Sequence, residues 1–322
     1  MGSPRVVVIV NPNSQGGALG RRWHELADSI RRALPFEDVH TRAPGDATRL
    51  AREALRGGAE VVAAVGGDGT INEVANGFFD DGGEPVAPAA AMAVLPFGTG
   101  GDFVRTVRIP KDFAKAVAVL ARGRTRRIDV GRIDHVRHER DGGGRAVRMF
   151  VNIGSFGLSG VTDRYANQSK KRFGGKLSFF AATTRAMLAY DNQRVRITFD
   201  DKPADAVDLT ISTVAVANGR YFGGGMHIAP DAEVDDGYFD VVAMGDMGLK
   251  DFLLHGRRVY AGTHLTMPKV SHRRARVVKA EPASTGQVVE LDVDGETPGV
   301  LPATFRVVPR ALNLIVPEAN GA

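Results

Sequence analysis

Glycines and one carboxylate interrupt the chain where an apolar run gives way to a polar one. The run Val61 to Val65 reads as a buried strand and leads directly into Gly66-Gly67-Asp68-Gly69-Thr70. Glycines open backbone N–H groups to close approach by a phosphate, whereas Asp68 would repel one. A cation removes the conflict, because Mg²⁺ takes one or two carboxylates together with phosphate oxygens. The pattern therefore predicts a phosphate site at which Asp68 holds Mg²⁺ directly or through water.

A tight glycine turn, with Asp68 as a solvated capping residue, is the alternative explanation of so short a motif. Two further glycine-rich loops at strand ends favour the phosphate site. They are residues 11–17, after a strand that starts at Arg5, and residues 95–103, after a strand that starts at Ala91. In α/β sheets, ligands bind beyond the carboxyl ends of the strands. No Walker lysine and no G-x-G-x-x-G accompany these loops, which argues against P-loop and dinucleotide hydride-transfer enzymes.

A second carboxylate that could take part in chemistry is Glu296. It follows the predicted strand Val288–Val293 through the turn Asp294-Gly295, which would project its side chain. Phosphoryl transfer to an alcohol needs a base for the hydroxyl proton, and a surface hairpin glutamate is the alternative. Asp292 and Asp294 share a face of this strand, where they either support Glu296 or face solvent.

Alternating strand and helix patterns that would position these loops fill the first third of the chain. Thr70 is expected to be the N-cap of its helix, with Glu73 completing a capping box. The order implies a parallel sheet with helices on both faces. The predicted strands are 5–10, 39–41, 61–65 and 91–95, and the predicted helices are 21–34, 46–56, 70–79 and 111–121.

Short strands replace this pattern after the basic connector Arg122 to Arg127. A helical interlude, Leu177 to Tyr190, interrupts them. We predict an antiparallel β-sandwich or barrel, so that the fold class is α/β plus all-β, with a nucleotide-binding domain at 1–125 and a β-domain at 126–309. The predicted strands are 129–135, 148–153, 194–199, 207–217, 238–244, 275–280, 288–293 and 304–308.

Composition limits the classes of function. The 322 residues include no cysteine, which excludes disulfides, thiol nucleophiles and cysteine metal sites, and the histidines lack zinc-ligand spacing. No signal peptide is recognisable and no apolar run approaches the ~20 residues that span a bilayer, so we expect a cytoplasmic protein. A net charge of +5 favours anionic partners. A basic cluster at 170–172 either contacts the inner face of a membrane or is a solvated loop. Nothing indicates nucleic acid binding, and a homo-oligomer is compatible with the sequence.

Taken together, five segments resemble the bacterial diacylglycerol kinase family of lipid kinases, which also includes sphingosine and ceramide kinases. They are "VNPNSQGG", "VGGDGTINEVANG", "LPFGTGGDFVRT", "ANGRYFGGGMHIAPDAEVDDGYFDVV" and "VDGE". The resemblance extends over residues 6–316. It implies an active site in a cleft between the two domains and a final segment, about 310–322, that returns to the first domain. The GGDGT element alone is shared with NAD kinases and 6-phosphofructokinases.

The resemblance also assigns roles to individual residues. Glu296 becomes the catalytic base and Asp68 the other catalytic residue. A structural Mg²⁺ is expected at the carbonyls of Glu233 and Tyr238 and the carboxylate of Asp236. The expected ATP-binding residues, to which we add Asn11 of the first loop, are Asn11, Thr41, Gly66, Gly67, Asp68, Gly69, Thr70, Ile71, Asn72 and Thr99.

The expected function is ATP- and Mg²⁺-dependent phosphorylation of a lipid hydroxyl, with diacylglycerol as acceptor and phosphatidic acid as product. An NAD kinase-like enzyme and a non-catalytic lipid- or nucleotide-binding sensor are the alternatives. One departure from the family pattern concerns the third loop, where G-T-(G/A)-N-D-F is usual and Gly101 replaces the asparagine. The departure removes an amide that would fix Asp102 or a phosphate.

Overall fold

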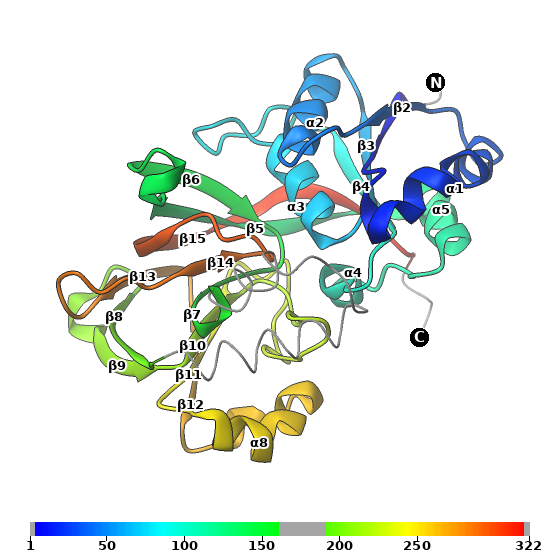
Figure 1. The fold of residues 1–322 in the computed structure, drawn as a ribbon. Coiled ribbons are helices and arrows are strands. Elements are labelled where there is room, and N and C mark those ends of the chain that lie inside the picture. Colours follow the sequence, from blue (N-terminus) through cyan, green and yellow to red (C-terminus); the bar gives the residue numbers. More distant parts are fainter. Residues whose placement is uncertain (1–3, 161–190, 319–322) are drawn as a thin grey trace. The chain divides into compact units, whose positions relative to one another are not determined.

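The chain folds into two compact units. The computed structural model describes residues 4–160 and 191–318. Unit 1 comprises the chain up to Val130 together with the segment from Pro309, and unit 2 comprises Gly131–Val308 (Figure 1). The predicted helix Leu177–Tyr190, the basic cluster before it and Asp163, a candidate contact for the acceptor head group, lie outside the described residues.

Unit 1 is built on a parallel sheet with the strand order β2-β1-β3-β4-β15. The C-terminal part of β15 joins it at the edge, where Asn313 and Leu314 pair with Ala91 and Met92. The central strands are buried along their whole length, as apolar runs in parallel sheets are. The strands are β1 (Val6–Val10), β2 (Glu37–His40), β3 (Val61–Gly66), β4 (Ala91–Pro96) and β15 (Val300–Val316).

Helices cover both faces of this sheet, as predicted. Figure 1 shows α2 and α3 on one face and α1 and α5 on the other. In α1 the residues Leu19, Trp23, Leu26 and Ile30 are buried at helical spacing. The helices are α1 (Ser14–Arg31), α2 (Asp46–Arg56), α3 (Asp68–Gly77), α4 (Asp102–Thr106) and α5 (Phe113–Arg122).

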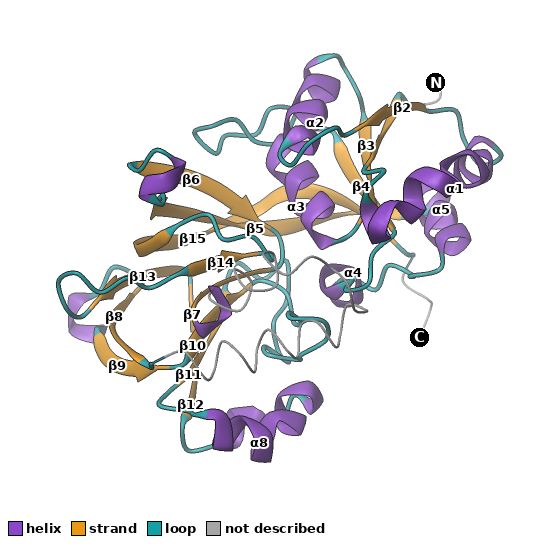
Figure 2. Cartoon of the chain, viewed as in Figure 1, coloured by secondary structure: helices purple, strands orange, loops and turns teal. Residues whose placement is uncertain are grey.

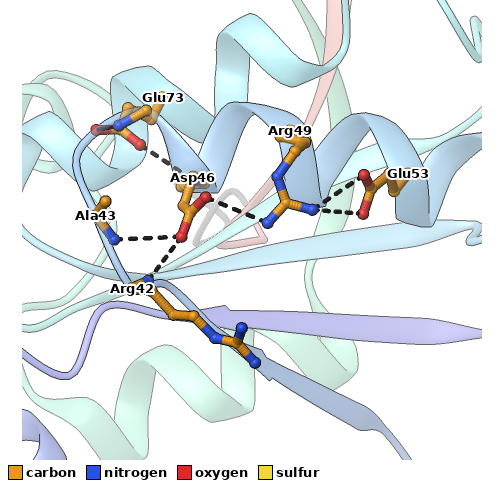
Figure 3. Close-up of polar contacts among 8 residues, drawn as sticks. Arg42, Ala43, Asp46, Arg49, Glu53 and Glu73 are labelled. Atoms are coloured by element: carbon orange, nitrogen blue, oxygen red, sulfur yellow. Dashed lines mark hydrogen bonds and ion pairs between the residues drawn. The ribbon is translucent and has the colours of Figure 1, made fainter.

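The prediction that Thr70 caps its helix is wrong, because α3 begins two residues earlier. Gly67 is the N-cap, and no side chain caps this end. The Glu73 carboxylate instead accepts hydrogen bonds from the backbone N–H groups of Gly45 (2.9 Å) and Ala47 (3.0 Å). Figure 3 shows Glu73 beside the start of α2, where Asp46 accepts from Arg42 and Ala43. Glu73 therefore ties α3 to the N-terminus of α2, which needs acceptors for its first amides.

Unit 2 is dominated by antiparallel strands (Figure 2). One sheet has the order β12-β11-β10-β7-β14; in the other, β15 pairs with β13, β13 with β8 and β8 with β9, while β5 pairs with β6. The strands are β5 (Arg124–Val136), β6 (Arg145–Phe150), β7 (Ile153–Gly157), β8 (Gln193–Phe199), β9 (Val207–Ile211), β10 (Thr213–Ala217), β11 (Phe239–Met244), β12 (Val270–Ala275), β13 (Val277–Pro282) and β14 (Leu291–Val293).

Four phenylalanines from both sheets form the centre of the unit 2 core. Phe150 stacks on Phe239 with ring centroids 5.6 Å apart, and Phe156 stacks on Phe305 at 6.1 Å. All four side chains are fully buried. Alternate residues of facing strands thus fill one apolar layer, as in a sandwich. The predicted fold class, α/β plus all-β, is confirmed.

Two α-helices among the described residues were not predicted, and three predicted strands, 148–153, 207–217 and 275–280, are each divided between two strands. The short helix α4 follows the third glycine loop, and α8 (Leu249–Ala261) lies between β11 and β12. The predicted strand 207–217 separates into β9 and β10 at Ser212, whose N–H is shared by the carbonyls of Met244 and Gly245.

Within residues 4–160 and 191–318, no helix combines the length and apolar character needed to cross a bilayer.

A histidine–carboxylate pair links β11 and β12. His272 Nε2 lies 2.6 Å from Oδ1 of the buried Asp240. This hydrogen bond raises the pKa of His272 against the opposing effect of burial; the charges of Asp240 and Asp231 also raise the pKa, and Arg274 lowers it. A raised pKa stabilises the fold below the ordinary histidine pKa of ~6.5. That contribution is lost as the pH rises through the folded-state value.

Replacing His272 with glutamine should therefore lower the free energy of unfolding more at about pH 5.5 than at about pH 9. We expect the two penalties to differ by roughly 1.5 kcal/mol, the scale of a hydrogen bond to a charged group. Urea unfolding followed by far-UV circular dichroism at both pH values measures this. Equal penalties for His272→Gln at both pH values would contradict the prediction.

Candidate functional site

The predicted phosphate-binding loops all begin at the same edge of the unit 1 sheet. Backbone bonds continue past the ends of the strands: Thr41 donates to Val10 (2.9 Å), Asn11 donates to Val65 (3.1 Å), and Phe97 donates to the carbonyl of Gly66 (2.7 Å). The loops that follow β2, β1, β3 and β4 are therefore held in register with one another. This edge is the one at which α/β sheets bind ligands.

Asp68 connects the second glycine loop to the third. Its Oδ2 accepts a hydrogen bond from the N–H of Gly101 at 2.7 Å. The carbonyl of Gly100, which belongs to the same peptide group, accepts from Lys111 Nζ at 2.5 Å. One peptide unit is thus held at its N–H by a carboxylate and at its oxygen by an ammonium group. Hydrogen bonds in such a chain polarise and strengthen one another.

Gly98 and Gly100 are required by the close approach of their neighbours. A Cβ added at Gly98 would lie 2.7 Å from the Cα of Gly67, and one at Gly100 would lie 2.4 Å from Asp68 Oδ2. Real Cβ atoms do not come this close. The glycines therefore allow the two loops to lie against each other, and not only to expose amides to a ligand.

A pocket of about 370 Å³ lies between these loops. Its lining includes Gly66, Gly67, Asp68, Gly98, Gly101 and Lys111. Ile71, a predicted site residue, also lines it. Asn11 is tied to the second loop, since its Nδ2 donates to Thr70 Oγ1 at 3.0 Å. The structure thus brings Asn11, Thr70 and the residues from Gly66 to Asp68 together.

Besides Asn11 and Thr70, which contact each other, four predicted ATP-binding residues are outside the described pocket lining. Thr41 is buried just beyond β2, and Asn72 is fully buried in α3, where its carbonyl accepts from Asn76 Nδ2 at 2.9 Å. Thr99 is exposed in the third loop. Gly69, in the first turn of α3, is likewise outside the described lining. The roles of all four in nucleotide binding stay predictions.

Asp68 fits the role of a Mg²⁺ ligand. Its Oδ1 is buried and has no hydrogen-bond partner in the part of the chain that the structure describes. A buried carboxylate oxygen without a donor is costly, and a bound cation or water removes that cost. Asp68 would therefore supply one Mg²⁺ ligand, with waters and phosphate oxygens supplying the others.

Two basic side chains line the pocket, and they differ in how their charge is balanced. Arg22 donates to both carboxylate oxygens of Glu25, each at 3.2 Å, and this pairing raises the pKa of Arg22 and lowers that of Glu25. Lys111 donates to a neutral carbonyl and to no carboxylate among the described residues. The positive charge of the pocket is therefore concentrated at Lys111.

In unit 2, two aspartates build the turn that carries Glu296. Asp294 accepts hydrogen bonds from the consecutive backbone N–H groups of Val151 (3.0 Å), Asn152 (3.2 Å) and Ile153 (2.7 Å). Asp292 is buried and accepts from the Ser155 hydroxyl at 3.1 Å and from the N–H of Gly295 at 2.9 Å. Of the two alternatives, support for Glu296 is therefore correct, and exposure of both aspartates to solvent is wrong.

Glu296 closes the tight turn that these aspartates hold. Its N–H donates to Val293 and its carbonyl accepts from Val293, at 3.1 and 2.8 Å. Asp294 and Gly295 both adopt positive φ, 51° and 87°, which suits aspartate and glycine better than other residues. The side chain of Glu296 is half-buried. Its backbone position is thus fixed by an extensive hydrogen-bond network.

The predicted structural metal loop carries ion pairs instead of a cluster of acidic groups. Asp236 Oδ1 accepts from the N–H of Tyr238 at 3.0 Å, and Oδ2 pairs with Arg274. Glu233 pairs with Arg220 at 2.5 Å. Among the described residues, no three acidic or histidine side chains converge as metal ligands. Arg274 and Arg220 thus balance the charges of Asp236 and Glu233, and the Mg²⁺ expected in this loop stays a prediction.

Comparison with known families agrees with this architecture. Residues 5–133 match the diacylglycerol kinase catalytic domain, and residues 152–316 match the YegS C-terminal NAD kinase beta sandwich-like domain. The chain belongs to the diacylglycerol kinase family. The family resemblance expected from the motifs is confirmed.

Similar proteins support a kinase. A protein named diacylglycerol kinase from Staphylococcus carnosus (strain TM300) is 28% identical over 98% of this chain and 95% of its own. The crystal structure of a proposed diacylglycerol kinase from Bacillus anthracis str. Sterne has a TM-score of 0.74 at 23% identity, covering 98% of this chain and 97% of that one. Yeast NADH kinase complexed with NADH has a TM-score of 0.54 at 12% identity, covering 99% and 84%, which shows a related fold alone.

Sequence reasoning missed two basic residues of the pocket lining, Lys111 and Arg22, neither of which is adjacent in sequence to the glycine–aspartate motif. The peptide between Gly100 and Gly101 lies in the third glycine loop that the sequence did indicate, but its hydrogen bonds with Asp68 and Lys111 were not predicted. Lys111 lies at the start of a predicted helix, where a lysine is usually a solvated surface residue. No motif spacing indicates it, because the loop that follows α4 brings it back to the pocket.

The close approach of the two loops yields a first prediction for this site. Gly98→Ala should destabilise unit 1 by about 1–3 kcal/mol, the cost of forcing extra volume against backbone. Urea unfolding followed by the fluorescence of Trp23, the only tryptophan and a buried residue of unit 1, measures the loss. Gly67→Ala is the matched control: its Cβ would lie an ordinary 3.7 Å from Gly98, so we expect only the smaller loss, of about 1 kcal/mol or less, that alanine causes at an N-cap position. Equal losses in both variants would refute the steric explanation.

The acidic turn in unit 2 yields a second prediction. Asp294→Asn removes the charge that three amides share, so it should lower stability by about 1–3 kcal/mol and reduce turnover by displacing Glu296. Circular dichroism in urea measures the first effect and a kinase assay the second. Asp205→Asn, at a surface ion pair with Arg273, should change both very little. A variant at Asp294 with native stability and turnover would show that the turn does not need this carboxylate.

Proposed function

We propose that this member of the diacylglycerol kinase family transfers the terminal phosphate of Mg²⁺·ATP to the hydroxyl of a lipid, with diacylglycerol as the acceptor and phosphatidic acid as the product. The observation that carries the donor half of this proposal is the pocket in unit 1. There, the Asp68 carboxylate is fixed by the N–H of Gly101 and keeps one oxygen for a cation. Glycine loops beside it offer backbone amides to phosphates.

Phosphoryl transfer depends mainly on positioning and on neutralising charge, and the pocket residues supply both. Amides at the start of α3 and in the third loop would bind phosphate oxygens, and Lys111 would add a positive charge. Mg²⁺, when bound by Asp68, supplies charge neutralisation to the phosphates. Asp68 itself is kept in place by its bond to the third loop and does not have to reorganise when the nucleotide binds.

The acceptor side of the proposal depends on Glu296. This carboxylate would take the proton of the lipid hydroxyl as the hydroxyl oxygen forms a bond to the γ-phosphorus. The bond from that phosphorus to the ADP oxygen breaks in the same transfer, and ADP leaves with the electron pair. The turn held by Asp292 and Asp294 favours such a role, because it restricts where the Glu296 backbone can lie.

A panel of acceptors tests the proposed function. The purified protein would be incubated with radiolabelled ATP, Mg²⁺ and diacylglycerol, sphingosine, ceramide or NAD. We expect label in phosphatidic acid. Label in NADP alone would favour the NAD kinase-like alternative, and ATP binding without transfer to any acceptor would favour a sensor. Neither result is compatible with the proposal.

Two substitutions separate the proposed roles of the carboxylates. Glu296→Gln should lower kcat by about 10²–10⁴-fold, the usual contribution of general base catalysis, and leave ATP affinity unchanged. Asp68→Asn should lower turnover and also weaken the dependence of ATP binding on Mg²⁺, measured by titration calorimetry. Glu281→Gln and Asp81→Asn, both at exposed positions, are the controls. Full turnover by Glu296→Gln would remove this residue from the mechanism.

A further inference from the structure

Resting on the proposed function, the structure assigns Lys111 as a ligand of the nucleotide's terminal phosphates, and Gly101 as the residue that makes room for it. The two residues form a pair that we call the Gly101–Lys111 pair. Lys111 lines the pocket, although it lies on the segment that leads into α5, outside the glycine loops. Its Nζ donates to the carbonyl of Gly100 at 2.5 Å, which places the ammonium group at the rim of the third loop.

The geometry of Gly101 explains why Lys111 can reach this place. A Cβ at position 101 would lie 2.8 Å from Lys111 Cε and 3.0 Å from its Nζ. Gly101 also has φ +75°, a conformation that glycine adopts freely and asparagine tolerates better than other residues. Any side chain at position 101 would therefore push the lysine side chain away from the loop. Lys111 can therefore hold its position against the third loop because residue 101 has no side chain.

The position of Lys111 relative to Asp68 indicates which phosphates it meets. Both side chains hold the peptide group between Gly100 and Gly101, Asp68 at the N–H and Lys111 at the oxygen. Asp68 is the residue that would hold a cation, and such a cation would neutralise charge on the terminal phosphates of the nucleotide. Lys111 thus lies one peptide group away from the group that would hold that cation. The same phosphates are therefore its expected partners.

The charges of the pocket support the same assignment. An ammonium group has three N–H donors, and Lys111 uses one of them on a neutral carbonyl. Arg22, the other cation of the described lining, is already paired with Glu25. Asp112 is occupied as the N-cap of α5, where it accepts from the N–H of Lys115 at 2.9 Å. Lys111 is thus the lining cation that no described carboxylate neutralises.

Nucleotide titrations of four proteins test this inference. Titration calorimetry in the presence of Mg²⁺ would give the Kd of ATP and of AMP for the native protein, Lys111→Met, Lys111→Arg and the control Lys115→Met. We expect Lys111→Met to weaken ATP binding about tenfold, the equivalent of ~1.4 kcal/mol, with AMP within about twofold. Lys111→Arg keeps the charge and should recover most of the affinity. Lys115→Met changes an exposed lysine of α5 outside the described lining and should bind ATP normally.

A double-substitution cycle tests the pairing with Gly101. Gly101→Asn should weaken ATP binding about tenfold by displacing the ammonium group, and it should do so while the fluorescence of Trp23 reports a native unfolding midpoint. In the double variant Gly101→Asn/Lys111→Met, the affinity should be no lower than in Lys111→Met, because the group to be displaced is already gone. Multiplied losses of about a hundredfold, or no loss with Gly101→Asn alone, would overturn the pairing.

The outcomes separate this inference from the proposed function. A native protein that binds ATP and phosphorylates a lipid, together with a Lys111→Met variant of equal ATP affinity, overturns the role of Lys111 alone. A native protein without affinity for ATP overturns the proposed function and the inference with it. Equal weakening of ATP and AMP by Lys111→Met would mean that the lysine does not meet the terminal phosphates, and it would also overturn the assignment.

Discussion

The hydrogen bond from the N–H of Gly101 to Asp68 is the interaction on which the proposed phosphate pocket depends. It joins the loops after β3 and β4, two neighbouring strands, through one carboxylate. Close packing of the loops leaves no room for side chains at Gly98 and Gly100. A charge is thereby fixed in the pocket before any ligand arrives, at the cost of a buried oxygen, Asp68 Oδ1, to which no described residue donates a hydrogen bond. Preorganisation of this kind is what phosphoryl transfer requires of a protein.

The turn that carries Glu296, in the antiparallel unit, is also held by hydrogen bonds from backbone N–H groups to carboxylates. Asp294 collects three successive backbone N–H groups, and Asp292 joins Ser155 to the turn. In unit 1 a backbone N–H donates to Asp68, which is itself proposed to take part in the reaction. In unit 2 backbone N–H groups donate to Asp292 and Asp294, which lie beside Glu296 in sequence. Such bonds restrict the backbone more tightly than contacts between flexible side chains would. The acidic residues of the two motifs therefore have different roles, since some are proposed to react and others hold the backbone.

Local signals in the sequence predicted most of the scaffold and only part of the site. Helix 46–56 follows from the spacing of its apolar residues, and strand 61–65 follows from its continuous apolar run. Capping was misjudged at Thr70, since Glu73 bonds to α2, a partner that is distant in sequence. Lys111 was missed for the same reason: its contact with Gly100 is formed only when α4 and the following loop have folded. Contacts between loops do not produce a periodic pattern of residues in the sequence.

The two halves of the proposed reaction, binding of the phosphate donor and choice of the acceptor, depend on different features of the protein. The proposed binding of phosphates by glycine loops and a carboxylate depends mainly on backbone geometry. Choice of acceptor requires side chains shaped for one molecule, and these change freely on a retained backbone. The Gly101–Lys111 pair combines both features, because the lack of a side chain at Gly101 determines where the side chain of Lys111 can lie. Variation at such coupled positions can alter phosphate contacts while the fold stays the same.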